Sequence, residues 1–118
     1  MRVTAISAVA LTAAGSIGVA VAQPAAGPVE FVPSSEGRLK VERLATLQFP
    51  WGMAGLPDGR LLITEKPGRL RIWDGTVLSE PIEGVPEVVY RGARDQGGFL
   101  DVAVEPQFED NGLGYLSY

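Results

Sequence analysis

The chain has 118 residues, with ten lysines and arginines against fourteen aspartates and glutamates, so its formal net charge is −4. This length allows one domain or part of a larger one, and the acidic balance argues against a nucleic-acid-binding surface. The sequence contains neither cysteine nor histidine, which excludes disulfides, thiolate chemistry and a histidine-dependent serine triad within these residues.

The first 22 residues have the pattern of a Sec signal peptide. Arg2 is the only charge before Glu30, residues 3–22 are uncharged and mostly small or apolar, and residues 20–22 form a small-x-small motif. We predict cleavage after Ala22, a periplasmic or secreted location and no stable membrane insertion afterwards. The alternative is a retained membrane anchor, because the run is about long enough to span a bilayer although it is only weakly apolar.

Residues 23–37 have the composition of a flexible linker. They contain three prolines, two glycines and two serines, which favour turns and irregular backbone. We therefore place the folded domain at residues 38–118. Within it, only residues 41–47 compete as a helix, and they have no clear start or stop signal.

Three short strands are predicted at residues 51–56, 61–65 and 69–73. Turn sequences separate them, Pro-Asp-Gly at 57–59 and Lys-Pro-Gly at 66–68, and Asp-Gly at 74–75 is a hairpin turn dipeptide. Because the last strand alternates polar and apolar residues, the pattern indicates an antiparallel meander.

Beyond residue 77 the pattern is looser. Prolines and glycine punctuate residues 79–89, which leave room for a short outer strand. Further strands are predicted at residues 99–104 and 114–118, with a turn at 109–112.

The strand–turn–strand pattern of residues 51–65 returns at residues 99–118, and Pro57 and Pro106 lie 49 positions apart. A period of about 40–50 residues with four strands is typical of propeller blades; on the pattern alone, an ordinary β-sandwich is the alternative. Since the chain ends inside an apolar strand, we expect an all-β fold comprising the first one to two blades of a truncated β-propeller. A complete small protein ending in a strand is the alternative.

Several segments resemble, in the same order, landmarks of one family. They are PWGMAGLPDG at 50–59, LITE at 62–65, GRL at 68–70, GVPEV at 84–88, QGGFLDV at 96–102, EPQF at 105–108 and YLSY at 115–118. These segments resemble the soluble glucose/sorbosone dehydrogenases, which are exported aldose sugar dehydrogenases dependent on pyrroloquinoline quinone (PQQ). The resemblance runs from about residue 40 to the last residue, and residues 96–102 make it specific.

The resemblance implies a six-bladed propeller that oxidises the anomeric hydroxyl of an aldose to a lactone. The family passes a hydride to PQQ, uses calcium to polarise and hold the quinone, and reoxidises it with an external electron acceptor. Its proton acceptor is a histidine. Because this sequence has no histidine, we predict that the 118 residues alone are inactive and do not bind these cofactors.

The resemblance assigns one candidate cofactor-binding residue, Gln96, at the edge of the PQQ pocket. A side-chain amide both donates and accepts hydrogen bonds, and Gly97 and Gly98 allow close backbone approach or an unusual φ. A solvated loop residue followed by a plain turn is the alternative. Arg91 and Arg94 precede this segment, and we interpret them as solvated loop charges rather than as partners of the cofactor.

Other groups carry weaker signals. Residues 109–111, Glu-Asp-Asn, offer oxygens for calcium but lack EF-hand spacing, so a hairpin turn is favoured. Four aromatic residues are interpreted as core rather than as a sugar-stacking platform: Trp51, Trp73, Tyr115 and Tyr118. Three scattered carboxylates form no assignable acid–base pair: Glu65, Asp101 and Glu105.

Two further functions remain open. One is a non-catalytic propeller that serves as a binding or scaffold module, and the other is a calcium-dependent lactonase on a similar frame. Fold alone does not decide between them.

Overall fold

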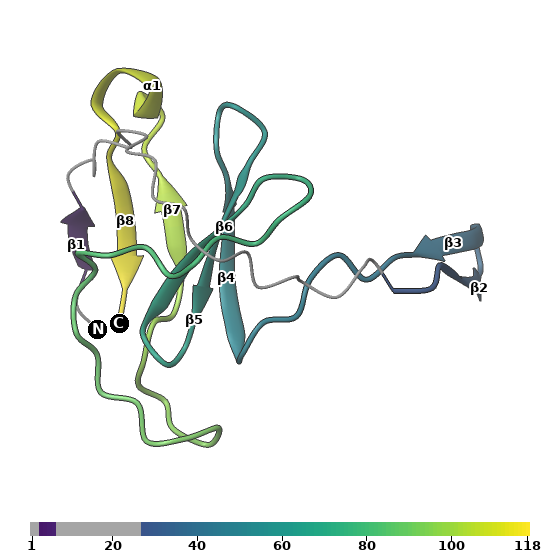
Figure 1. The fold of residues 1–118 in the computed structure, drawn as a ribbon, viewed down its shortest axis with the longest axis horizontal. Coiled ribbons are helices and arrows are strands. Elements are labelled where there is room, and N and C mark those ends of the chain that lie inside the picture. The colour runs from purple at the N-terminus through teal and green to yellow at the C-terminus, as the bar shows by residue number, and fades with distance from the viewer. Residues whose placement is uncertain (1–2, 7–26) are drawn as a thin grey trace, which may run out of the picture.

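The computed structural model describes residues 3–6 and 27–118, which form antiparallel sheets and one helical turn (Figure 1). The all-β prediction is therefore confirmed. In the part of the chain described, no helix is long and apolar enough to cross a membrane. Most of the predicted signal peptide, and with it the membrane-anchor alternative, lies outside the described residues, so both stay predictions.

The first sheet is the predicted meander, with strand order β4-β5-β6. β5 (Leu61–Glu65) and β6 (Arg69–Trp73) have the predicted bounds, and β4 (Pro50–Gly55) begins and ends one residue earlier than predicted. The register of β4 shifts between Pro50 and Met53, which marks a β-bulge. Each turn is closed by a backbone hydrogen bond, from Gly59 to the Leu56 carbonyl and from Gly68 to the Glu65 carbonyl, both 3.0 Å.

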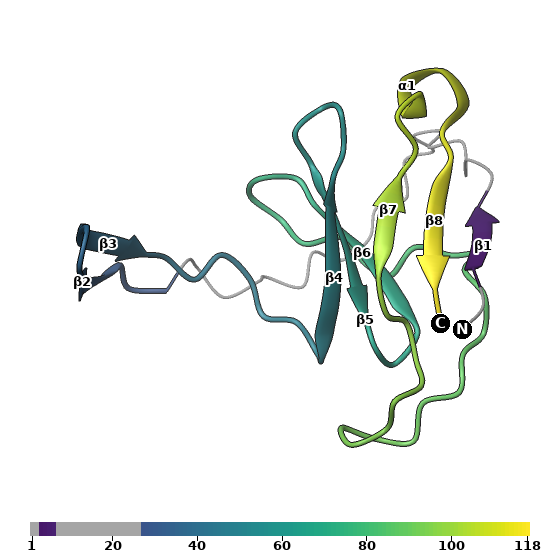
Figure 2. The same ribbon diagram turned by 180° about the vertical axis from the view of Figure 1, so that it is seen from behind.

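The second sheet contains β7 (Val102–Val104) and β8 (Gly114–Ser117), with β7 beside β4 of the first sheet (Figure 2). β7 is shorter than the predicted strand at 99–104. The reason is another bulge: the Leu100 amide donates to the Ser117 carbonyl at 2.8 Å, while the Ser117 amide donates to the Asp101 carbonyl at 3.0 Å. Two residues therefore oppose one, which interrupts the regular ladder.

The short helix α1 (Phe108–Asn111) overlaps the predicted turn at residues 109–112. Gly112 ends it in the left-handed conformation, at φ 62°, and its amide donates to the Phe108 carbonyl. Glycine is favoured at this position because it has no Cβ to strain.

A third strand, β1 (Val3–Ile6), pairs antiparallel with the outer edge of β8, in the order β1-β8-β7. It lies inside the predicted signal peptide. The pairing has a physical reason, since β8 would otherwise leave its edge without a partner strand, and three of the four residues of β1 are β-branched.

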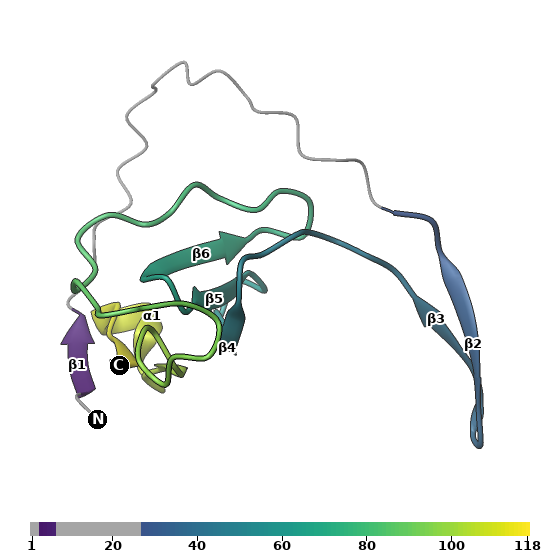
Figure 3. The same cartoon turned by 90° about the horizontal axis from the view of Figure 1, so that it is seen from below.

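The predicted linker contains half of a hairpin, formed by β2 (Glu30–Ser34) and β3 (Gly37–Val41). The sequence-based boundary at residues 37/38 therefore falls inside a paired element rather than at the end of irregular chain. A two-residue turn at 35–36 joins the strands, and the Ser34 hydroxyl donates to the Gly37 carbonyl at 2.7 Å. Figure 3 shows the hairpin reaching away from the other sheets, and residues 42–47 beyond it form no helix.

The main core lies between the first and second sheets. It is built from residues of both: Leu56, Leu62, Leu70, Phe99, Val102 and Leu116. A smaller cluster of Ile63, Trp73 and Leu78 lies on the other face of the first sheet. Alternation along β5 explains the two clusters, because Leu62 and Ile63 point to opposite faces.

Residues 79–89 form no outer strand, which corrects the sequence-based expectation. After the predicted Asp-Gly turn there is a single bridge between Trp73 and Leu78. The chain then follows β6 with only two backbone hydrogen bonds, from Ser79 to Ile72 and from Ile82 to Leu70, each 2.8 Å. Pro81 has no amide hydrogen to donate, so a continuous ladder cannot form there.

Candidate functional site

Gln96 lies in a loop, residues 91–98, that is organised by the neighbouring Asp95. The Asp95 carboxylate accepts hydrogen bonds from the backbone amides of Arg91, at 2.7 Å, and Gly97, at 3.0 Å. The bond from Gly97, followed by that from Arg91, lowers the pKa of Asp95. The carboxylate is thus kept ionised as the centre of the loop, and the side chain of Gln96 is left exposed.

Gly97 and Gly98 lie where other backbone segments pass very close. A Cβ on Gly97 would lie 2.5 Å from the Val89 carbonyl oxygen, and one on Gly98 would lie 2.2 Å from the Lys66 carbonyl oxygen. Gly98 also has φ +102°. Side chains are therefore excluded at both positions by backbone atoms, which is more than a plain turn requires.

Lys66, which the sequence analysis treated only as a turn residue, is buried against this loop. Its side chain is 6% exposed, and its ammonium donates to the Asp95 carbonyl. The same ammonium lies 4.9 Å from the centre of the Trp51 ring and 5.8 Å from that of Tyr90. The available signal was the alternation along β5, which places residue 66 on the inward face with Leu62 and Thr64.

Thr64 joins the first sheet to the start of the second. Its hydroxyl accepts from the Gly52 amide at 2.8 Å and donates to the Leu100 carbonyl at 2.6 Å. A Cβ on Gly52 would lie 2.7 Å from a carboxylate oxygen of Asp101. Thr64 and Lys66, both buried, thus place β5 against residues 95–101 through polar contacts as well as through the apolar core.

Glu65 points to the opposite face and forms a structural ion pair. Its carboxylate lies 2.6 Å from Arg69 Nε and 3.5 Å from Arg71 Nη1, and it also accepts from the Gln48 amide. Burial by itself raises the pKa of Glu65, but the bonds from Arg69 and Gln48 and the charges of both arginines outweigh it, so the pKa is lowered. An ionised, fully paired carboxylate is not available as a general base.

The other two candidate carboxylates, Asp101 and Glu105, also accept hydrogen bonds from backbone amides. Asp101 accepts from the Val102 amide at 2.9 Å, and Glu105 accepts from the Gln107 amide at 2.6 Å and the Asn111 side chain at 2.9 Å. Among residues 3–6 and 27–118, no three acidic, histidine or cysteine side chains are grouped to hold a metal.

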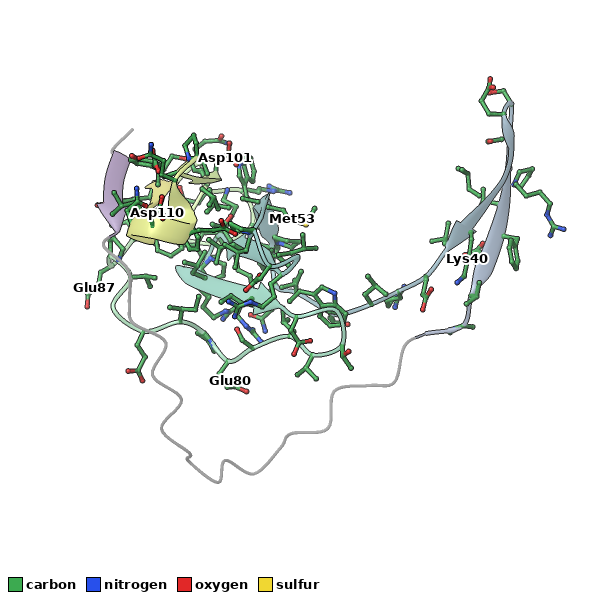
Figure 4. The ribbon with its side chains drawn as sticks, turned by 90° about the horizontal axis from the view of Figure 1, so that it is seen from above. Lys40, Met53, Glu80, Glu87, Asp101 and Asp110 are labelled. Atoms are coloured by element: carbon green, nitrogen blue, oxygen red, sulfur yellow. The ribbon has the colours of Figure 1, made fainter. Side chains whose placement is uncertain are left out.

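The aromatic residues divide into core and surface. Trp73 is buried and Tyr118 packs edge-on against Phe99, with ring centres 6.2 Å apart, whereas Tyr115 is exposed, so its assignment to the core is wrong. The sequence-based assignment of Trp51 to the core is also wrong, because this residue is 58% exposed. It belongs to the bulged part of β4, which also carries the exposed Met53 that Figure 4 labels. Arg91 and Arg94 are exposed, as a solvated loop charge requires.

This arrangement of blade-like antiparallel sheets with a glycine-rich loop at their junction defines a propeller-type, all-β protein. A profile of the glucose/sorbosone dehydrogenase family matches residues 47–118. The chain therefore belongs to the glucose/sorbosone dehydrogenase family.

The chain is also similar to individual proteins. An uncharacterized protein of Synechocystis is 40% identical over 128 residues, covering 95% of this chain and 31% of the relative. The aldose sugar dehydrogenase YliI of Escherichia coli is 46% identical over 74 residues, covering 61% and 19%. Human Hedgehog-interacting protein is 34% identical over 83 residues, covering 65% and 12%.

A solved structure of a glucose dehydrogenase is also similar, with 49% identity and a TM-score of 0.56 over 61% of this chain. The match covers 22% of that glucose dehydrogenase. The chain thus spans under a third of the length of each of these relatives.

Proposed function

We propose that this chain is the N-terminal portion of an exported dehydrogenase that oxidises the anomeric hydroxyl of an aldose to a lactone with PQQ. The observation that carries the proposal is the loop around Gln96. Its QGGFLDV sequence is the most specific part of the family resemblance, and the loop is organised by Asp95 so that Gln96 is exposed. A matched relative is named for the oxidation of aldose sugars.

The residues of this loop fit one edge of a quinone site. The exposed amide of Gln96 can donate to a carbonyl or carboxylate oxygen and accept from a hydroxyl, and Gly97 and Gly98 present backbone without side chains. PQQ would supply the hydride acceptor, with calcium polarising its carbonyl. Gln96 would orient the cofactor or the sugar, while the proton acceptor and the basic residues that clamp carboxylates are not identified among these 118 residues.

Because these 118 residues contain no histidine, they lack the general base that the proposed reaction requires. Removing a general base slows a reaction by about 10²–10⁴-fold, and most of the pocket would also be missing. We expect no sugar oxidation from residues 1–118 by themselves. In the proposed role they supply the first blades and one edge of the site.

The experiment is to express the longest product that the reading frame encodes, add PQQ and calcium, and follow aldose-dependent reduction of a dye. Turnover that requires PQQ supports the proposal, and no turnover with any common aldose contradicts it. Gln96→Ala should lower cofactor affinity roughly three- to tenfold, the value of one hydrogen bond. Gln107→Ala is the matched control, because residue 107 adjoins α1 at the far end of the second sheet (Figure 1) and should change nothing.

Export is part of the same proposal. We expect the protein in the periplasmic or secreted fraction, with Gln23 as its first residue after cleavage at Ala22. N-terminal sequencing of the fractionated protein tests this. A protein that retains Met1 in the membrane fraction would favour the anchor instead.

A second candidate is a non-catalytic binding or scaffold propeller. It is favoured by the match to a protein named for an interaction, the human Hedgehog-interacting protein. A longest product that folds but binds no PQQ would favour this function over the dehydrogenase.

A further inference from the structure

Lys66 is the one buried cation that contacts the Gln96 loop in the described part of the chain. Its side chain is 6% exposed, although it follows β5 directly, at a turn where a lysine could reach water. A buried charge is costly unless it is compensated. Long lysine side chains ordinarily extend their ammonium toward solvent, so the inward position requires specific partners.

Those partners are two aromatic rings and one carbonyl. The ammonium lies over Trp51 and Tyr90, at 4.9 and 5.8 Å from the ring centres, within the range of cation–π attraction. It donates its hydrogen bond to the Asp95 carbonyl. Among residues 3–6 and 27–118, no carboxylate oxygen lies within 4.0 Å of its nitrogen. The carbonyl oxygen of Asp95 is therefore the oxygen partner of the Lys66 ammonium.

Lys66 contacts the loop at two points, one on each side of Gln96. Its ammonium holds Asp95, the residue before Gln96. Its own carbonyl accepts from the Phe99 amide at 3.1 Å and lies against Gly98. Gln96 and Gly97 are thus bracketed by a single residue of the first sheet.

We propose that Lys66 is the positioning residue for Gln96, fixing the loop at the edge of the cofactor site through the ammonium–Asp95 contact. This inference rests on the proposed function only in placing the loop at a cofactor site. The contact between Lys66 and Asp95 does not depend on that function. Lys66 touches no reacting atom in this role. Its loss should loosen the loop and weaken binding of the cofactor without changing the chemical step.

The test compares three variants of the longest encoded product. Lys66→Met keeps the apolar stem but removes charge and donor, and Lys66→Arg keeps both. Lys40→Met is the control, because Lys40 is the other lysine of these 118 residues and lies exposed on the hairpin. Amide hydrogen exchange is measured at residues 92–99 and, for reference, in β6. We expect Lys66→Met to speed exchange of the loop about tenfold, the loss of one charged hydrogen bond. Exchange in β6 should not change, and Lys66→Arg should restore most of the protection.

Exchange that rises equally in the loop and in β6 would overturn the proposal, because Lys66 would then support only global stability. An unchanged loop would overturn it as well. If Lys66→Met does not fold, ¹⁵N-lysine NMR of the unaltered protein decides instead. The Lys66 ammonium should give a slowly exchanging signal shifted by the rings, and a signal as averaged as that of Lys40 would contradict the contact.

Titration with PQQ separates this inference from the proposed function. If both hold, Lys66→Met raises the dissociation constant for PQQ by no more than Gln96→Ala does, roughly three- to tenfold, and kcat at saturating PQQ stays within twofold of the unaltered protein. A lowered kcat at saturation would contradict a purely positioning role. If the unaltered protein binds no PQQ, the dehydrogenase proposal fails, while the exchange data still decide whether Lys66 holds the loop.

Discussion

The hairpin β2–β3 and the meander β4-β5-β6 have similar strand lengths but opposite environments. All ten residues of the hairpin strands are exposed, including Phe31 and Leu39, whereas β5 is buried from Leu62 to Glu65. Figures 3 and 4 show the hairpin standing apart, with Lys40 far from the packed sheets. Backbone pairing therefore defines both elements, but only the meander has a second sheet against which it can bury a face.

The largest loss of stability is expected at Gly98, where two backbone segments lie in contact. Gly98→Ala would place a Cβ 2.2 Å from the Lys66 carbonyl oxygen at φ +102°, and should cost at least about 4 kcal/mol of unfolding free energy. Gly37→Ala is the hairpin control, because φ there is also positive, at +128°, but nothing lies within 4 Å. Urea unfolding followed by circular dichroism measures both. Equal losses would mean that φ alone, and not the close approach, determines the cost.

Next in size is a pair of leucine truncations. Leu116 is fully buried between the two sheets, and Leu39 is 55% exposed on the hairpin. Leu116→Ala should lower the unfolding free energy by about 3 kcal/mol, because it leaves a cavity in the main core. Leu39→Ala should change it by less than about 0.5 kcal/mol. A large effect at residue 39 in the same urea titration would show that the hairpin is packed in solution.

The third comparison concerns charge. Glu65→Gln should cost about 2 kcal/mol, since Arg69 and Arg71 would lose a buried partner but keep Gln48 and Ser79 as acceptors. Glu42→Gln in the exposed Lys40–Glu42 pair should have no measurable effect.

The same glutamate predicts a pH dependence. The pKa of Glu65 is lowered from its ordinary 4.5, so the unfolded chain binds the proton first as pH falls. The stability that Glu65 contributes is therefore complete above about pH 4.5 and is lost as pH falls through the lower folded pKa. Thermal melts between pH 3 and pH 7 should show a steeper acid loss in the unaltered protein than in Glu65→Gln. Parallel curves would contradict the ion pair.

The smallest effect concerns the outer edge of β8. A protein beginning at Gln23 lacks β1 and its four register pairs with β8, so the amides of β8 that face β1 should exchange faster. The unpaired edge should also favour self-association, which sedimentation at two concentrations would detect. Unchanged exchange in β8 would mean that Val3–Ile6 does not pair there in solution.

Much of the fold was predictable because its signals are local. The Pro-Asp-Gly and Lys-Pro-Gly turns and the alternation at residues 69–73 fixed β5 and β6 to the residue. The bulges at Pro50–Met53 and Leu100–Asp101 were not predictable, since a bulge depends on the partner strand. The hairpin was missed because Pro33 and Gly37 suggested a linker, although they flank a two-residue turn that allows pairing.

Some features of the candidate site could likewise be predicted from the sequence, whereas others required the structure. The importance of the Gln-Gly-Gly segment came from sequence, through its resemblance to a family, and its two glycines have the close approach that their lack of Cβ permits. The inward turn of Lys66 and the exposure of Trp51 came only from the structure. Both depend on where β4 and β5 meet the 91–98 loop, which lies about 30 residues further along the chain than β5.

The strand periodicity, the turns, the acidic charge, the lack of histidine and the family landmarks follow from the sequence alone, because each is a property of composition or of short segments of the chain. Tertiary structure decided which buried polar groups serve the loop and which serve the sheet. Thr64 and Lys66 face residues 95–101, while Glu65 between them faces two arginines. The physical reason is that alternate residues of a strand point to opposite faces, and only the packed partners determine what each face contacts.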